Sequence, residues 1–238
     1  MKLSFYGADQ CVTGSCHCLE VNGKNILIDC GLQQGRDEVN NEALPFHPGS
    51  IDFVLITHAH IDHTGRVPML VKQGFQGRIL TTRVTANLMD IMLLDSAHIQ
   101  ESDAEWKNRK AARSGAPKVE PLYTIEDAEN VKQYVTTCEY GEDVELCEGV
   151  SVRFDDAGHL LGSACITVTA TENGVTKKLI FSGDLGESVK NVFQNIGKRF
   201  TFGGEAPKDQ RVYYFNTKEL TGNKYGTPSP VPFRVVDQ

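Results

Sequence analysis

The chain has 238 residues, of which 40% are hydrophobic and 23% are charged, and its formal net charge at pH 7 is -7. A chain of this length can bury a good core and usually forms one domain, or at most two. The acidic charge argues against loose, sequence-independent affinity for nucleic acid. No run of about 18 apolar residues is present, so no membrane-spanning segment is predicted.

Short strands are predicted through the first third of the chain. They are the β-type runs Leu3–Tyr6, Cys18–Val21, Asn25–Ile28, Phe53–Ile56 and Arg78–Thr81. The run Cys16-His17-Cys18 suggests a zinc site, but alternation along a strand points both cysteines to one face. We therefore expect these two cysteines in the core.

A long helix is predicted from about Thr85 to Ala112, where apolar residues keep an approximate i, i+3, i+4 spacing. Gly115-Ala116-Pro117 ends it. Thr124 followed by Asp127 indicates the start of another helix, because an acidic residue is favoured in the first turn. Strands resume at Val150–Phe154, Ala164–Thr169 and Lys178–Phe181. Strands, then helices, then strands again predict a layered α/β sandwich.

The character of the chain changes after Gly186. Residues 186–238 contain eight of the 18 phenylalanines and tyrosines but no histidine or cysteine, and their balance of eight basic and five acidic residues leaves -10 for residues 1–185. We place a domain boundary near residues 186–200.

The seven cysteines are odd in number and dispersed, which argues against a disulfide framework and predicts a cytoplasmic location.

The run from Thr57 to Gly65, Thr-His-Ala-His-Ile-Asp-His-Thr-Gly, directly follows the predicted strand Phe53–Ile56. Open α/β sheets hold their sites at such strand ends. Imidazole and carboxylate are the ligands that borderline divalent metals prefer, zinc above all. His58 and His60 can converge on one ion while Asp62 and His63 turn towards a second. The alternative is a solvated loop that carries histidines by chance.

Two later segments place one ligand-type side chain each just past a strand. They are Gly158-His159-Leu160-Leu161-Gly162-Ser163-Ala164 and Phe181-Ser182-Gly183-Asp184-Leu185-Gly186. Flanking glycines let backbone approach closely. Alone, each segment is more typical of turn chemistry. Together with the first cluster, His159 and Asp184 indicate metal ligands.

These residues carry a family resemblance. The pattern H-x-H-x-D-H, then a histidine, then an aspartate after a strand resembles the metallo-β-lactamase superfamily, whose fold is a layered αββα sandwich. The resemblance implies that His58, His60 and His159 hold one ion, that Asp62 and His63 hold the second, and that Asp184 bridges both. Asp29 matches a family aspartate that supports the ligands from behind.

The context of these motifs narrows the resemblance. The opening Gly-Ala-Asp-Gln-Cys-Val-Thr-Gly-Ser-Cys-His, the segment Asp-Cys-Gly-Leu-Gln-Gln-Gly, and the surroundings of His159 and Asp184 are similar to the β-CASP RNA-processing nucleases. The match covers about residues 1–186. It implies an RNA substrate whose phosphodiester is hydrolysed by a water. Two divalent ions that lie about 3.5–4 Å apart activate this water. Zinc is expected, with manganese as the alternative.

The resemblance also implies roles for individual residues. Asp62 would orient the nucleophile as well as bind metal, and Asp184 would act with it at the reacting centre. The backbone of Gly162 and the hydroxyl of Ser163 could donate to a phosphate oxygen. A turn residue that caps its own loop is the equally favoured interpretation of Ser163.

The chain departs from the family pattern after Asp184. The family then has a β-CASP domain, which supplies a histidine that protonates the leaving group, and a return of the chain, which supplies a further metal-binding histidine. No histidine follows His159 here. We therefore expect residues 1–190 to form a metallo-β-lactamase-like domain that is incomplete at its C-terminus. Residues 191–238 would be a divergent tail.

Part of the tail has a resemblance of its own. The stretch Phe202–Leu220 is similar to an early segment of bacterial SPFH-domain (stomatin-like) proteins, which implies a junction near residues 190–200. A gene fusion, an assembly artefact or a misread frame would each produce such a junction. The alternative is that the tail supplies substitute strands for the unfinished sheet.

The leading hypothesis is a metal-dependent ribonuclease of the RNA-processing type. One rival is a small-molecule metallohydrolase of the same fold, which would cleave an ester, thioester or lactam. The other is an inactive truncated or chimeric fragment. Missing strands would leave an exposed sheet edge and an apolar face, so self-association through the incomplete sheet is expected in that case.

Overall fold

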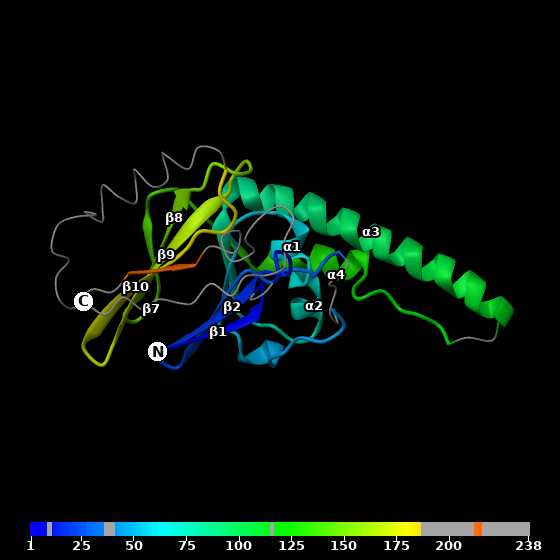
Figure 1. Cartoon of the computed structure of the whole chain (residues 1–238), viewed down its shortest axis with the longest axis horizontal. Coiled ribbons are helices and arrows are strands. Elements are labelled where there is room, and N and C mark those ends of the chain that lie inside the picture. Colours follow the sequence, from blue (N-terminus) through cyan, green and yellow to red (C-terminus); the bar gives the residue numbers. More distant parts are fainter. Residues whose placement is uncertain (9–10, 36–40, 115–116, 187–211, 216–238) are drawn as a thin grey trace.

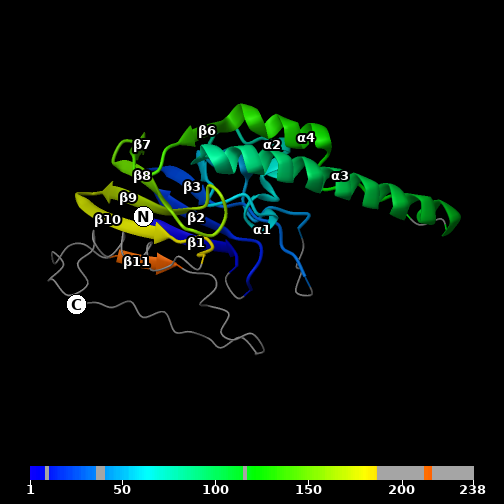
Figure 2. The same cartoon turned by 90° about the horizontal axis from the view of Figure 1, so that it is seen from above.

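The computed structural model describes residues 1–8, 11–35, 41–114, 117–186 and the backbone of residues 212–215. Two β-sheets pack against each other, and helices cover the outer face of the first sheet (Figures 1 and 2). This layered α/β arrangement confirms the predicted fold class. Among the described residues, the helices lie on one side of the pair of sheets (Figure 2).

The first sheet is mixed. Its strand order is β1-β2-β3-β4-β5-β6. The strands are β1 (Lys2–Gly7), β2 (Cys16–Val21), β3 (Lys24–Ile28), β4 (Phe53–Leu55), β5 (Arg78–Thr82) and β6 (Val135–Cys138). The first three strands form an antiparallel meander, whereas β3, β4, β5 and β6 run parallel. The carboxyl ends of these parallel strands therefore meet at one edge, where a site is expected.

The second sheet is mainly antiparallel. Its order is β11-β10-β9-β8-β7. The strands are β7 (Asp143–Cys147), β8 (Val150–Asp156), β9 (Ala164–Glu172), β10 (Val175–Phe181) and β11 (Val212–Phe215). Strand β11 pairs with β10 in parallel, Lys178 opposite Val212. This pairing is what the alternative of a tail that supplies a strand would require.

The helices follow the parallel strands of the first sheet. They are α1 (Ile61–Thr64), α2 (Val67–Lys72), α3 (Arg83–Ser114), α4 (Ile125–Glu129) and the 3-10 turns η1 (Pro48–Ser50) and η2 (Asn130–Tyr134). Helix α3 is 32 residues long, and its C-terminal half extends well beyond the two sheets (Figure 1). Among the described residues, no helix is long and apolar enough to cross a membrane.

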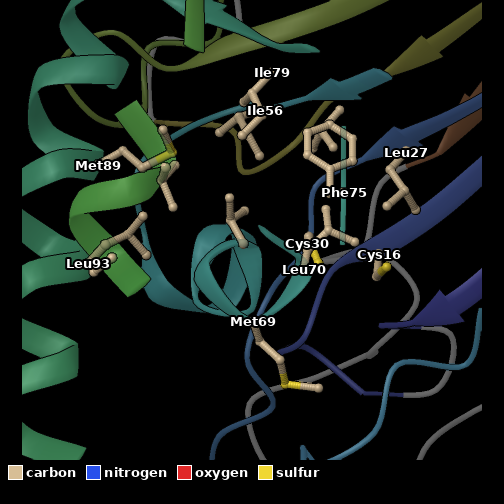
Figure 3. Packing of buried hydrophobic residues seen from close by; sticks show 14 of the residues in the cluster. Cys16, Leu27, Cys30, Ile56, Met69, Leu70, Phe75, Ile79, Met89 and Leu93 are labelled. Atoms are coloured by element: carbon tan, nitrogen blue, oxygen red, sulfur yellow. The ribbon is translucent and has the colours of Figure 1, made fainter. Parts of the chain in front are cut away.

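Alternation along β3 builds two hydrophobic cores. Leu27 points to the helices, where it packs in a cluster with Phe75, Leu70 and Met89 (Figure 3). Ile26 and Ile28 point the other way, into the cluster between the two sheets. The last three residues of β3 are therefore buried on both faces and form a continuous apolar run, as is typical of parallel sheets.

Cys16 and Cys18 on β2 are both buried in the cluster on the helical side, so the prediction of a core role for these cysteines is confirmed.

Thr124 begins α4 with a capping box: its hydroxyl accepts from the backbone N–H of Asp127, and the Asp127 carboxylate accepts from the N–H of Thr124. The predicted helix start is therefore also confirmed. The predicted domain boundary near residues 186–200 falls almost wholly outside the described residues.

Candidate metal centre

Four strand ends deliver the predicted ligands to one place. Asp29 follows β3, the histidine cluster follows β4, His159 lies between β8 and β9, and Asp184 follows β10. The two sheets are joined at this end by a hydrogen bond from the backbone N–H of Ala164 to the carbonyl of Thr57, at 2.8 Å. The site therefore lies where both sheets end, and each of the four segments reaches it directly after a strand.

His58, His60, His159 and Asp184 form a group in which one ligand atom from each side chain lies within 4.8 Å of all the others. His60 Nδ1 is 3.0 Å from His58 Nε2 and 3.3 Å from His159 Nε2. His159 Nε2 is 3.5 Å from a carboxylate oxygen of Asp184. Three imidazoles and a carboxylate at these separations suit the four-coordinate geometry of a divalent ion such as zinc.

A second group shares Asp184. His63 Nε2 is 3.7 Å from Asp184 Oδ1 and 3.8 Å from Asp62 Oδ2. The imidazole of His63 is almost completely buried, but Asp62 and Asp184 retain 19% and 13% side-chain exposure. The carboxylates are therefore the members of this group that a substrate can approach. Asp184 contacts both groups, which is the bridging position that the resemblance implies.

Asp29 holds the second group from behind. Its carboxylate is 2.7 Å from His63 Nδ1 and accepts hydrogen bonds from the backbone N–H of Thr57 and the hydroxyls of Thr57 and Ser15. Asp29 has a positive φ of 59°, a conformation that aspartate tolerates better than most residues. The ionised carboxylate favours a proton on His63 Nδ1, so that Nε2, once deprotonated, would present its lone pair towards Asp62 and Asp184.

The protonation of the buried residues follows from these contacts. Burial, together with the charge of His63, lowers the pKa of His58 to about 3, so this imidazole stays neutral and keeps its lone pair. Burial alone would lower the pKa of His63, but the adjacent Asp29 carboxylate outweighs it and raises that pKa. Burial would likewise raise the pKa of Asp29, and His63 reverses this and holds it low. Asp29 is therefore ionised at neutral pH.

Two residues around the ligands were not predicted from the sequence. Ser15 and Thr57 are almost completely buried, and the Thr57 hydroxyl lies 3.1 Å from His58 Nδ1 as well as contacting Asp29. Ser15 precedes β2 and Thr57 follows β4, so each adjoins a strand that leads to the site. A hydroxyl residue is too common beside a strand to be distinctive. Only the folded structure shows which carboxylate each one meets.

Close backbone packing explains several of the glycines. A Cβ atom on Gly31 would lie 1.7 Å from the carbonyl oxygen of Asp62, and one on Gly183 would lie 2.8 Å from Thr57 Cβ. Gly183 also has a positive φ of 54°. Both positions therefore require glycine if the ligand segments are to approach each other this closely.

The phosphate contact suggested at Gly162 and Ser163 stays a prediction. The Ser163 side chain is buried, and its Oγ accepts from the backbone N–H groups of His159 and Leu160, both at 3.1 Å. The Gly162 carbonyl accepts from the hydroxyls of Thr82 and Thr85. Ser163 thus caps its own loop, the second of the two interpretations, and shapes the turn that carries His159.

The residues fit divalent metal ions. His63 Nε2 is a buried nitrogen with no hydrogen-bond partner among the described residues, although it faces two carboxylates. Such an orphaned atom is costly unless an ion or water satisfies it. His58 and His60 likewise bring two ring nitrogens within 3.0 Å of each other. A cation between these nitrogens and the carboxylates would satisfy them together.

Comparison with known proteins supports this interpretation. Residues 10–223 match the family described as the metallo-beta-lactamase superfamily. A ribonuclease of Thermus thermophilus is 37% identical over 193 residues, which are 81% of this chain and 39% of that protein. Cleavage and polyadenylation specificity factor 73 of Drosophila melanogaster is 32% identical over 191 residues, 77% of this chain and 25% of that protein.

Among solved structures, a motif mutant of the metallo-beta-lactamase from Cronobacter sakazakii aligns with a TM-score of 0.48 at 20% identity, over 92% of this chain and 78% of that one. The chain spans well under half the length of the two sequence relatives above.

Proposed function

Because the chain belongs to the metallo-beta-lactamase superfamily, we propose that it is a metal-dependent phosphodiester hydrolase that acts on RNA. The observation that carries the proposal is the convergence of His58, His60, His159 and Asp184 at one point, with Asp62 and His63 beside them. A relative with the word ribonuclease in its name, 37% identical over 81% of the chain, supports RNA as the substrate.

The ligand assignment is part of this proposal. His58, His60 and His159 would hold one ion, Asp62 and His63 the second, and Asp184 both. Two divalent cations held side by side would lower the pKa of a water and neutralise charge on the phosphate oxygens. We favour zinc because four of the six ligands are imidazoles, whereas manganese prefers sites richer in oxygen ligands.

The protein's own residues define the approach of the substrate. His58 and His63 are buried, whereas His159, Asp62 and Asp184 keep 20%, 19% and 13% side-chain exposure. His60 is partly exposed as well, so among the described residues these four side chains form the side from which a phosphodiester would approach. In the proposed reaction Asp62 would accept a hydrogen bond from the attacking water and so orient it. Asp29 supports the centre indirectly by holding the ring of His63.

The cellular location is also a proposal. All seven cysteines are free thiols, and the buried thiols of Cys16 and Cys30 contact each other without forming a disulfide. Adjacent unbridged thiols are typical of a reducing compartment, so we propose that the protein works in the cytoplasm. Self-association through a sheet edge stays a prediction, which sedimentation of the purified chain would test.

The proposal is tested by incubating the chain with zinc or manganese and a 5′-labelled RNA of 20 nucleotides, with a chromogenic ester and a lactam in parallel. We expect the chain to cleave the RNA into fragments. EDTA should abolish this cleavage, and the His58→Ala variant should not cleave. The His98→Ala variant, which removes an exposed histidine of α3, is the matched control and should cleave normally. Ester or lactam cleavage without RNA cleavage would contradict the proposal.

A further inference from the structure

The far end of α3 carries a basic surface around the chain's single tryptophan. Residues 106–119 contain five basic residues and no acidic one, although the chain as a whole has a net charge of -7. We call Trp106, Lys107, Arg109, Lys110 and Lys118 the α3 tip. The four charged members are exposed, and 51% of the Trp106 surface is accessible. The tip is thus a local reversal of charge on an acidic protein.

The members of the tip are held together by the fold. Trp106, Arg109 and Lys110 stand at i, i+3 and i+4, and so share one face of the helix. Lys110 Nζ lies 3.8 Å from the centre of the Trp106 ring. Such a pair keeps a flexible ammonium group beside an aromatic face.

Lys118 reaches the tip because the chain turns back along α3. The side-chain amide of Asn108 donates to the carbonyl of Val119 at 2.9 Å, and its oxygen accepts from the N–H of Val119 at 2.8 Å. This pair of hydrogen bonds fastens Val119 to the helix at Asn108. The neighbouring Lys118, a fourth positive charge, is thereby brought to the same end of α3 as the other three.

The N-terminal end of α3 lies beside the loop that carries His159. The hydroxyl of Thr85 donates to the carbonyl of Gly162 at 2.8 Å, in the loop that carries His159. Trp106 lies 21 residues further along the helix, and at 1.5 Å per residue this is about 32 Å. At about 3.4 Å per nucleotide of a stacked strand, that span corresponds to about nine nucleotides. Figure 1 shows α3 leading away from the two sheets.

We propose that the α3 tip binds a single-stranded RNA about nine nucleotides from the scissile phosphate, with Trp106 stacking on a base and the basic side chains contacting phosphates. Exposed aromatic side chains flanked by positive charge are the usual platform for single strands without sequence preference. The inference rests on the proposed RNA substrate. It adds a length requirement: RNA that is too short to reach the tip gains nothing from it.

The single tryptophan allows a direct test. Its emission would be followed while a 20-nucleotide or a 5-nucleotide oligouridylate is added with metal present, and binding would be measured separately by polarisation of a label on the RNA. We expect the 20-mer to quench Trp106 and the 5-mer not to. Arg109→Glu combined with Lys110→Glu should weaken binding of the 20-mer about tenfold and reduce the salt slope by roughly 1.4, at about 0.7 for each phosphate contact.

The matched control is Lys132→Glu combined with Lys177→Glu, which makes the same change of net charge elsewhere on the described surface. It should bind the 20-mer like the unmodified chain. Equal binding by both double variants, or binding of the 20-mer without quenching, would overturn the proposal. So would a shift of Trp106 emission with protein concentration alone, because the tip would then contact a second copy.

The two proposals fail separately when cleavage of the same 20-mer is assayed alongside its binding. RNA cleavage without any response of Trp106 removes the tip proposal and leaves the hydrolase. Quenching by the 20-mer without cleavage supports the tip and removes the hydrolase.

Discussion

At the scale of single residues, the centre depends on ligand type and on which atom each ligand presents. Four of the six predicted ligands were recognisable because histidine and aspartate at H-x-H-x-D-H spacing have few other uses, whereas His159 and Asp184 were indicated only together with these four. The hydroxyls of Ser15 and Thr57 were not, since their roles depend on long-range contacts to Asp29, 14 and 28 residues away. Sequence spacing indicates which atoms can bind an ion, but not which neighbours orient them.

His60 offers the most direct residue-scale test. Its Nδ1 lies within 3.3 Å of the ligand nitrogens of both His58 and His159. The His60→Ala variant should therefore lose about one metal ion per chain, because the first ion would keep only two imidazoles and a carboxylate that it shares with the second ion. Elemental mass spectrometry of the purified variant measures this, with His98→Ala as the control. Retention of both ions would show that the ligand assignment is wrong.

Asp29→Asn tests the orientation of His63. The amide preserves the shape, but its NH₂ group can donate to His63 Nδ1, which would move the ring proton to Nε2, the atom that faces Asp62 and Asp184. We expect metal affinity to fall by about 10–100-fold. Nitrogen NMR of the imidazole should show the exchanged tautomer. Ser15→Ala, which removes one hydrogen bond to the same carboxylate, should keep the original tautomer; an unchanged tautomer in Asp29→Asn would refute the explanation.

At the scale of elements, the ends of strands determine the site. The strands with continuous apolar runs, such as β3 and β4, were predicted to within two residues because burial on both faces leaves a clear pattern. Strands β6 (Val135–Cys138) and β7 (Asp143–Cys147) and helices α1 (Ile61–Thr64) and α2 (Val67–Lys72) were missed. Two central residues of β6 are exposed, and α1 is a single turn whose sequence is dominated by the ligands. Short elements are defined by tertiary contacts rather than by local pattern.

The approach of two such elements is tested by Gly31→Ala. The added methyl group would lie 1.7 Å from the Asp62 carbonyl oxygen and would push α1 away from the end of β3. Overpacking of this kind costs about 1–3 kcal/mol, so the thermal midpoint should fall and metal affinity with it. Gly49→Ala is the control, because its methyl group would meet mainly the exposed His47 side chain. Equal midpoints for the two variants would contradict the packing argument.

At the scale of the whole molecule, an acidic protein is proposed to attract a polyanion. The metal ions and the α3 tip would place positive charge at two separate points of a chain whose net charge is -7. The fold class followed from the order of strands and helices, and the family match over residues 10–223 bears it out. The origin of residues 191–238 stays a prediction, although β11 pairs with β10.

The centre is proposed to be preformed for two divalent ions, and the metal content of the monodisperse chain is the measurement that decides this. After incubation with zinc or manganese and gel filtration, elemental mass spectrometry should find about two ions per chain. The bound metal should also raise the free energy of unfolding, by about 2.7 kcal/mol at a free-metal concentration 100 times the Kd. A chain that is folded and monodisperse but retains no metal would contradict the claim.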